Sequence, residues 1–276
     1  SDFEGGDGRS GGDGGRGGEG TDGGTGSEPT VDVTDIDGNR TTIDSDTLRD
    51  IIEHFDDGYG TLIIGSIDEN IAEYGRIVND IFGDGISINI EKIGEFDNIS
   101  ISKITAETID PEKVGEKERE LADMINSGIS IVVGRSFGTD GKENIASHHF
   151  VGDDGKAMIS TINIGKISEL YNAVDDIENR KREESYIDIR EMLVHEIVES
   201  YYAQRDAYDK SHSSDGKSAH QKAKEFQNAW GIETNGVGTI EFNGVQGLGT
   251  YKFDNGISSR FYDNKGNLDI ETRRWR

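Results

Sequence analysis

Hydrophobic and polar residues alternate along residues 31–43, on either side of the tripeptide Asp37-Gly38-Asn39. Alternation is the period of a β-strand, and Asp, Gly and Asn favour tight turns, so this segment predicts a hairpin. Farther along, apolar residues that recur every three or four positions predict helices, and short apolar runs predict strands. We expect helices at residues 46–55, with Asp46 as the N-cap, 71–82 and 111–126, and strands at residues 61–65, 85–90, 99–104 and 129–133.

The second half of the chain continues this mixture of helices and strands. A polar loop at residues 206–215 separates two segments with helical periodicity. The expected elements are a hairpin at residues 150–164, helices at residues 167–182, 184–205 and 218–230, and a β-meander, marked by Gly and Asn-Gly turns, at residues 236–276. The order of elements predicts an α+β fold with a mixed sheet.

Composition separates the first 28 residues from the rest. Residues 1–28 are almost wholly Gly, Asp, Glu, Ser, Thr and Arg, and Phe3 is their only large apolar side chain. Such a segment has little apolar surface to bury, so we expect a disordered linker. It has no apolar run behind basic residues, which excludes a signal peptide and suggests a processed C-terminal piece of a larger protein.

Three regions are expected after this linker. Residues 29–110 form an α+β region whose role is a cover, a docking unit or part of one continuous fold. Residues 111–235 form the domain that carries the candidate chemistry, and residues 236–276 form the β-meander.

Charge and cysteine content exclude several classes of function. The formal net charge is −26, so nucleic acids and anionic membranes would be repelled, whereas a basic substrate would not. The absence of cysteine excludes disulfides, thiolate catalysis and cysteine-type zinc sites. No run approaches the roughly 20 apolar residues that a membrane-spanning helix needs.

The candidate chemistry lies in residues 192–202, where His195, Glu196 and Glu199 stand among Leu, Val and Ile. Ionisable groups in an apolar setting cost several kcal/mol unless a partner compensates them. Residues four apart share one face of a helix, so His195 and Glu199 can bind one divalent ion. Glu196 is rotated by about 100° and can reach a water molecule on that ion as its general base.

A catalytic zinc site needs a third protein ligand. His220 is the first candidate because it lies on the next expected helix, and His212 in the polar loop is the second. Several side chains could stabilise an oxyanion: Tyr201, Tyr202, Tyr208 and His212. His148 and His149 could instead join the site as ligands or substrate-binding groups. The competing interpretation is a helix with a coincidental charged face formed by Glu191, His195, Glu199 and Tyr202.

The segment Leu193-Val194-His195-Glu196-Ile197-Val198-Glu199, behind an expected edge strand, resembles the HExxH helix of zincin-like metallopeptidases, with Glu199 in place of the second His. The string His-Glu-x-x-Glu-Ser-Tyr followed by Ala219-His220 is also similar to metallopeptidase domains at the C-termini of Rhs-type and other polymorphic bacterial toxins. This resemblance covers about residues 150–230.

The resemblance implies a zincin-like fold and a zinc-dependent peptidase with a protein or peptide substrate. It implies His195, Glu199 and His220 as Zn²⁺ ligands and Glu196 as the general base. It also implies an effector secreted or delivered outside the producing bacterial cell, with an immunity protein or a delivery apparatus as partners. The alternative is a non-enzymatic acidic surface or assembly module that keeps this helix as scaffold.

Overall fold

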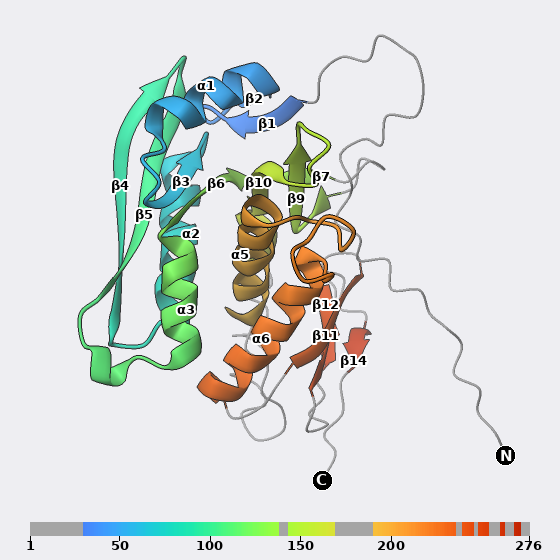
Figure 1. Ribbon diagram of the computed structural model, residues 1–276. Coiled ribbons are helices and arrows are strands. Elements are labelled where there is room, and N and C mark those ends of the chain that lie inside the picture. The colour runs from blue at the N-terminus through green and yellow to red at the C-terminus, as the bar shows by residue number, and fades with distance from the viewer. Residues whose placement is uncertain are drawn as a thin grey trace, which may run out of the picture.

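A six-stranded mixed sheet forms the centre of the protein, seen in a computed structural model that describes residues 30–137, 143–168 and 190–235 and four short strands beyond them (Figure 1). The strand order is β4-β5-β3-β6-β10-β9. The bounds are β3 Gly60–Ile64, β4 Ile86–Phe96, β5 Ile99–Thr108, β6 Ser127–Gly134, β9 Ala146–Phe150 and β10 Ala157–Asn163. The expected α+β class with a mixed sheet is confirmed. The expected linker at residues 1–28 lies outside the described residues.

Both strand directions occur in the sheet. Strands β3, β6 and β10 are parallel to one another, while β5 is antiparallel to β3 and β9 is antiparallel to β10 at the opposite edge. Strands β3, β4 and β5 come from residues 30–110, and β6, β9 and β10 come from residues 111–235. The two expected regions therefore build one continuous sheet.

One face of the sheet is covered by the N-terminal hairpin and helix α1. The hairpin consists of β1 (Thr30–Thr34) and β2 (Arg40–Asp44), and α1 spans Ser45–Phe55. The N-cap of α1 is Asp44 rather than the expected Asp46, because Asp44 is extended and its carboxylate accepts from the Thr47 amide at 2.7 Å. Asp46 instead stands in the first helical turn.

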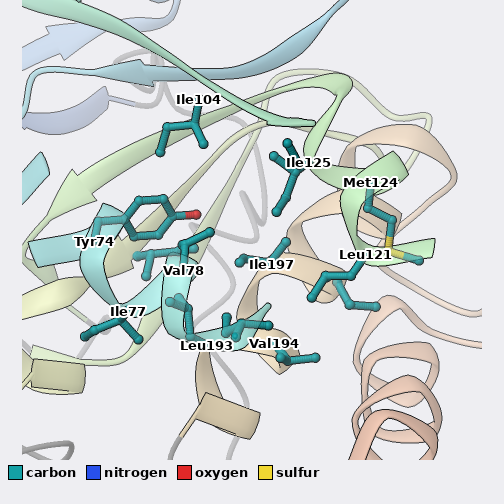
Figure 2. Close-up of a cluster of buried hydrophobic side chains, with 14 of the residues drawn as sticks. Tyr74, Ile77, Val78, Ile104, Leu121, Met124, Ile125, Leu193, Val194 and Ile197 are labelled. Carbon is teal, nitrogen blue, oxygen red and sulfur yellow. The ribbon is translucent and has the colours of Figure 1, made fainter. Parts of the chain in front are cut away.

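Four helices cover the other face: α2 (Asp68–Ile81), α3 (Glu116–Ile125), α5 (Arg190–Arg205) and α6 (Ala219–Asn235). Their apolar side chains form one cluster with the sheet, and Figure 2 shows Tyr74 and Val78 of α2 near Leu193 and Ile197 of α5. Helix α5 is buried on nearly every side from Glu191 to Ser200. Because the helix is enclosed in this way, the charged residues that it carries over this stretch are held inside the protein.

Several boundaries differ from the expected ones. Helix α3 does not start at residue 111, because Pro111–Lys113 form a short 3₁₀ turn. The amides of Lys117 and Glu118 donate to the Glu233 carboxylate of α6, so a tertiary contact caps α3 where a local pattern could not show it. Strands β4 and β5 run longer than expected, into a hairpin that joins Phe96 to Ile99.

The remaining expected elements are only partly described. Residues 164–168 begin the helix expected at 167–182, whose other residues lie outside the described part, as do residues 184–189 of the next helix. Where a β-meander is expected, the structure has two separate antiparallel pairs: β11 (Thr239–Val245) with β12 (Leu248–Phe253), and β13 (Arg260–Tyr262) with β14 (Leu268–Glu271). The described residues do not join these pairs into one sheet, so the meander stays a prediction. A short pair, β7 (Ser136–Phe137) and β8 (Glu143–Asn144), precedes β9. Among the described helices, none has the length and apolar character needed to cross a bilayer.

Candidate metal centre

The candidate centre lies between helices α5 and α6, which run side by side on the sheet (Figure 1). His195 and Glu199 stand one turn apart on α5, and His220 stands in the first turn of α6. The loop between the helices is fixed by Lys222, whose ammonium group pairs with Asp206 and, at 3.0 Å, with Asp215. These two ion pairs hold the loop so that the chain reverses direction and the start of α6 lies beside the middle of α5.

Three ligand-type atoms converge in this place. His195 Nε2 lies 2.9 Å from Glu199 Oε2, His220 Nδ1 lies 3.1 Å from the same oxygen, and the two histidine nitrogens are 3.2 Å apart. Across the described ranges, His195, Glu199 and His220 form the group of His and acidic residues able to hold a metal ion. His195 and Glu199 are buried, whereas the His220 side chain is 36% exposed, so the centre opens towards solvent on the α6 side.

Contacts on both ring nitrogens connect His195 to helices α5 and α6. Its Nδ1 lies 3.0 Å from Gln227 Oε1 of α6, and its Nε2 lies 2.9 Å from Glu199 Oε2, one turn along α5. These two contacts fix the orientation of the imidazole and direct Nε2 at the place where Glu199 and His220 meet.

The carboxylate of Glu199 is held in its charged form. Burial alone would raise its pKa, but contacts from the rings of His148, His195 and His220 lower that pKa well below the ordinary value of a glutamate. A carboxylate that stays ionised inside the protein is suited to bind a positive ion. The structure brings together His195, Glu199 and His220, the three residues predicted as ligands, and their role as ligands stays a prediction.

Glu196 stands beside this group with the opposite tendency. It is only 8% exposed, and burial, with the neighbouring charge of Glu199 as a second cause, raises its pKa well above the ordinary value. Glu196 therefore holds a proton more readily than a surface glutamate does. Bound divalent metal would oppose this shift, because a positive ion favours the ionised carboxylate.

The other expected site residues lie around the centre at different depths. The Tyr208 ring lies against His148, with ring centroids 5.0 Å apart, and Tyr202 is half-buried with the Lys222 ammonium 4.8 Å from its ring centroid. Tyr201 packs edge-on against Tyr202. His212 is exposed in the loop and its Nδ1 contacts Ser211.

His149 points away from this group. Its Nε2 lies 3.1 Å from the Ser45 hydroxyl of α1, the helix on the opposite face of the sheet from α5. Its neighbour His148 faces α5, as alternation along a strand requires. Of the two histidines expected near the centre, His148 therefore contacts Glu199, whereas His149 contacts Ser45.

Sequence reasoning missed Gln227, the hydrogen-bond partner of His195. A signal was present, because Gln227 follows His220 by seven residues and two helical turns bring both side chains to one face of α6. The spacing alone does not distinguish Gln227 from a surface amide, which is common on helices, but in the structure Gln227 is buried.

The structure thus shows a buried His/Glu/His triad that could bind a metal ion. Comparisons with protein-family models, curated proteins and solved structures found no match to this chain. The resemblance to zincin-like peptidases therefore stays a prediction from the sequence, and functional inference rests on the geometry of the triad.

Proposed function

We propose that the protein is a zinc-dependent peptidase whose metal is held by His195, Glu199 and His220. The observation that carries the proposal is the approach of three ligand atoms to within 3.2 Å of one another, at a place where His195 and Glu199 are both buried. Zinc lies about 2.0–2.1 Å from such ligands in a tetrahedron, which places the ligand atoms roughly 3.3 Å apart. The three separations are close to that value, so the residues fit the ion.

The composition of the triad favours a catalytic zinc over calcium or magnesium and over a structural zinc. Imidazole nitrogen suits zinc better than it suits calcium or magnesium, which prefer oxygen ligands. Three protein ligands leave the fourth tetrahedral position open for water or substrate. The part-exposed His220 lies at the solvent side of the group, so that position is within reach of a substrate.

Glu196 is the proposed general base. When bound, zinc lowers the pKa of water towards about 7 and polarises a substrate carbonyl. Glu196 accepts a proton from the attacking water and later passes it to the leaving amine. Its buried position raises its affinity for that proton, and its place next to His195 on α5 keeps the carboxylate beside the metal ligands.

Two features of the fold support the zincin-like part of the proposal. The antiparallel edge strand β9 and the helix α5 with its His-Glu pair stand in the order that the resemblance implies. Helix α5 also packs against β10 and β9. A protein or peptide substrate agrees with the net charge of −26, which disfavours nucleic acids. Delivery outside a producing bacterial cell, and an immunity protein as partner, complete the proposal on the basis of the sequence resemblance.

Zinc content is the first test. Elemental analysis of protein purified without chelator should find close to one equivalent of zinc, and His195→Ala should abolish it. His212→Ala is the matched control, since it removes an exposed histidine that makes no contact with the triad, and it should retain the metal. Wild-type protein free of zinc after dialysis against the metal would refute the proposal.

Activity is the second test. A library of quenched fluorescent peptides should contain substrates that the zinc-loaded wild type cleaves, and Glu196→Gln should keep the metal while losing cleavage. Full zinc content together with undiminished cleavage in Glu196→Gln would remove Glu196 from the mechanism. Full zinc content without cleavage of any peptide by the wild type would instead support a metal-bound scaffold without enzymatic function.

A further inference from the structure

We infer that His148 is a positioning residue that holds one oxygen of Glu199, so that the other oxygen alone faces the metal. The inference rests on the proposed metal centre but not on peptidase activity. His148 lies on strand β9, 47 residues before His195 in the chain, and it is not one of the three converging ligands.

The two oxygens of Glu199 have different partners. Oε2 lies within 3.1 Å of His195 Nε2 and His220 Nδ1, whereas Oε1 lies 3.4 Å from His148 Nε2. The His148 side chain is 3% exposed, so water does not compete for this contact. One oxygen of the carboxylate thus faces the metal position, and the other faces strand β9.

A chain of hydrogen bonds behind His148 starts at the backbone of β6. Gln204 of α5 receives the Ser130 amide on its Oε1 at 2.9 Å and donates from Nε2 to the Ser130 carbonyl at 2.8 Å, which fixes the orientation of its amide. The same Nε2 donates to the Ser160 hydroxyl on β10 at 3.0 Å. Ser160 is fully buried and lies opposite His148 in the β9–β10 pair.

The chain of hydrogen bonds favours a hydrogen on Nε2 of His148. Ser160 accepts from Gln204, so its own hydrogen can be donated to His148 Nδ1 at 2.8 Å. The hydrogen of the neutral ring then lies on Nε2 and points at Glu199 Oε1. A donor in this position favours Glu199 as a ligand through one oxygen, and a carboxylate bound through one oxygen leaves the fourth metal position free.

A positioning role for His148 can be separated from a purely structural one by comparison with its neighbour on the strand, His149. His149 is also buried and hydrogen-bonded, but to Ser45 on the other face. His148→Phe and His149→Phe therefore remove similar buried rings, and only the first removes a donor to Glu199. His148→Gln keeps an N–H donor on a side chain of comparable reach.

The test measures zinc affinity by competition with a chromophoric chelator, and the visible absorption spectrum of the cobalt-substituted protein. His148→Phe should weaken zinc binding about 10- to 100-fold, the usual effect of losing an outer-sphere partner. Its cobalt spectrum should change in intensity as Glu199 binds through both oxygens. His148→Gln should recover most of the affinity and the spectrum, and His149→Phe should match the wild type in both.

If His148→Phe does not fold, Ser160→Ala provides a second variant. It removes the donor to His148 Nδ1 with almost no change in volume, and it should shift the cobalt spectrum in the same direction as His148→Phe. Wild-type affinity and spectrum in these variants, with zinc bound by the wild type, would overturn the role of His148 alone. A wild type that binds no zinc would overturn the metal centre and this inference together.

Discussion

Replacement of His220 by alanine tests the third ligand, because the proposed zinc site depends on this residue joining two residues of another helix. His220 contributes Nδ1 to the centre, but its side chain is 36% exposed and lies in the first turn of α6. Loss of the imidazole therefore removes a metal ligand without opening a large cavity in the core. The substitution should leave folding intact and abolish the response to zinc.

The expected magnitude follows from mass action. A ligand that binds only the folded state at 100 times its Kd stabilises that state by about 2.7 kcal/mol. For a protein of this size each kcal/mol raises Tm by roughly 2–4 °C, so zinc should raise the wild-type Tm by roughly 5–11 °C. In chelator, His220→Ala should unfold within about 2 °C of the wild type, since part-exposed substitutions cost about 0.5 kcal/mol.

Differential scanning fluorimetry in EDTA and in a zinc series measures both quantities. His212→Ala is the control, because His212 is the other histidine that could have supplied the third ligand, and it should keep the full zinc shift. The reasoning is refuted if His220→Ala retains the wild-type shift. A shift lost in His212→Ala and kept in His220→Ala would move the third ligand to the loop.

Three further predictions concern the surroundings of the centre. Leu193→Ala should cost about 2–5 kcal/mol, measured as a lower urea midpoint with an unchanged slope, because Leu193 is fully buried in the main cluster. Gln227→Leu should weaken zinc binding about 10- to 100-fold in a chelator competition, since it frees the ring of His195; unchanged affinity would count against this role. Lys222 is the main cause of the lowered pKa of Asp206, so Lys222→Met should destabilise the protein near neutral pH. A lowered pKa adds stability above the unfolded value of about 3.9, so urea midpoints of the two proteins should converge as the pH falls below that value.

The part of the centre on α5 could be predicted because it is local. A helix places residues four apart on one face, so the spacing of His195 and Glu199 determines their proximity once the helix is assigned. His220 could be proposed because the loop before it is long enough to return the chain. The loop is held by the ion pairs of Lys222 with Asp206 and Asp215. These pairs could not be predicted, because in the sequence their residues look like those of any solvated loop.

The parts that could not be predicted depend on pairing between distant segments. His148 reaches Glu199 only because β9 pairs antiparallel with β10 and places His148 opposite Ser160. A shift of one residue in that register would turn His149 to α5 instead. Likewise part of the cap at the start of α3 comes from Glu233, which lies more than one hundred residues later. The choice of Asp44 over Asp46 as N-cap rests on backbone angles that two aspartates in one segment do not reveal.

The burial of α5 connects the fold to the proposed chemistry. Glu196 and Glu199 lie on one enclosed helix, yet their surroundings move their pKa values in opposite directions. Three histidine rings keep Glu199 charged, as a metal ligand must be, while burial beside that charge makes Glu196 a stronger proton acceptor. A surface helix with the same sequence would leave both residues solvated and alike, because water would screen the difference. The apolar residues around the His-Glu pair are therefore part of the site, since they create the environment that gives two identical side chains two different roles.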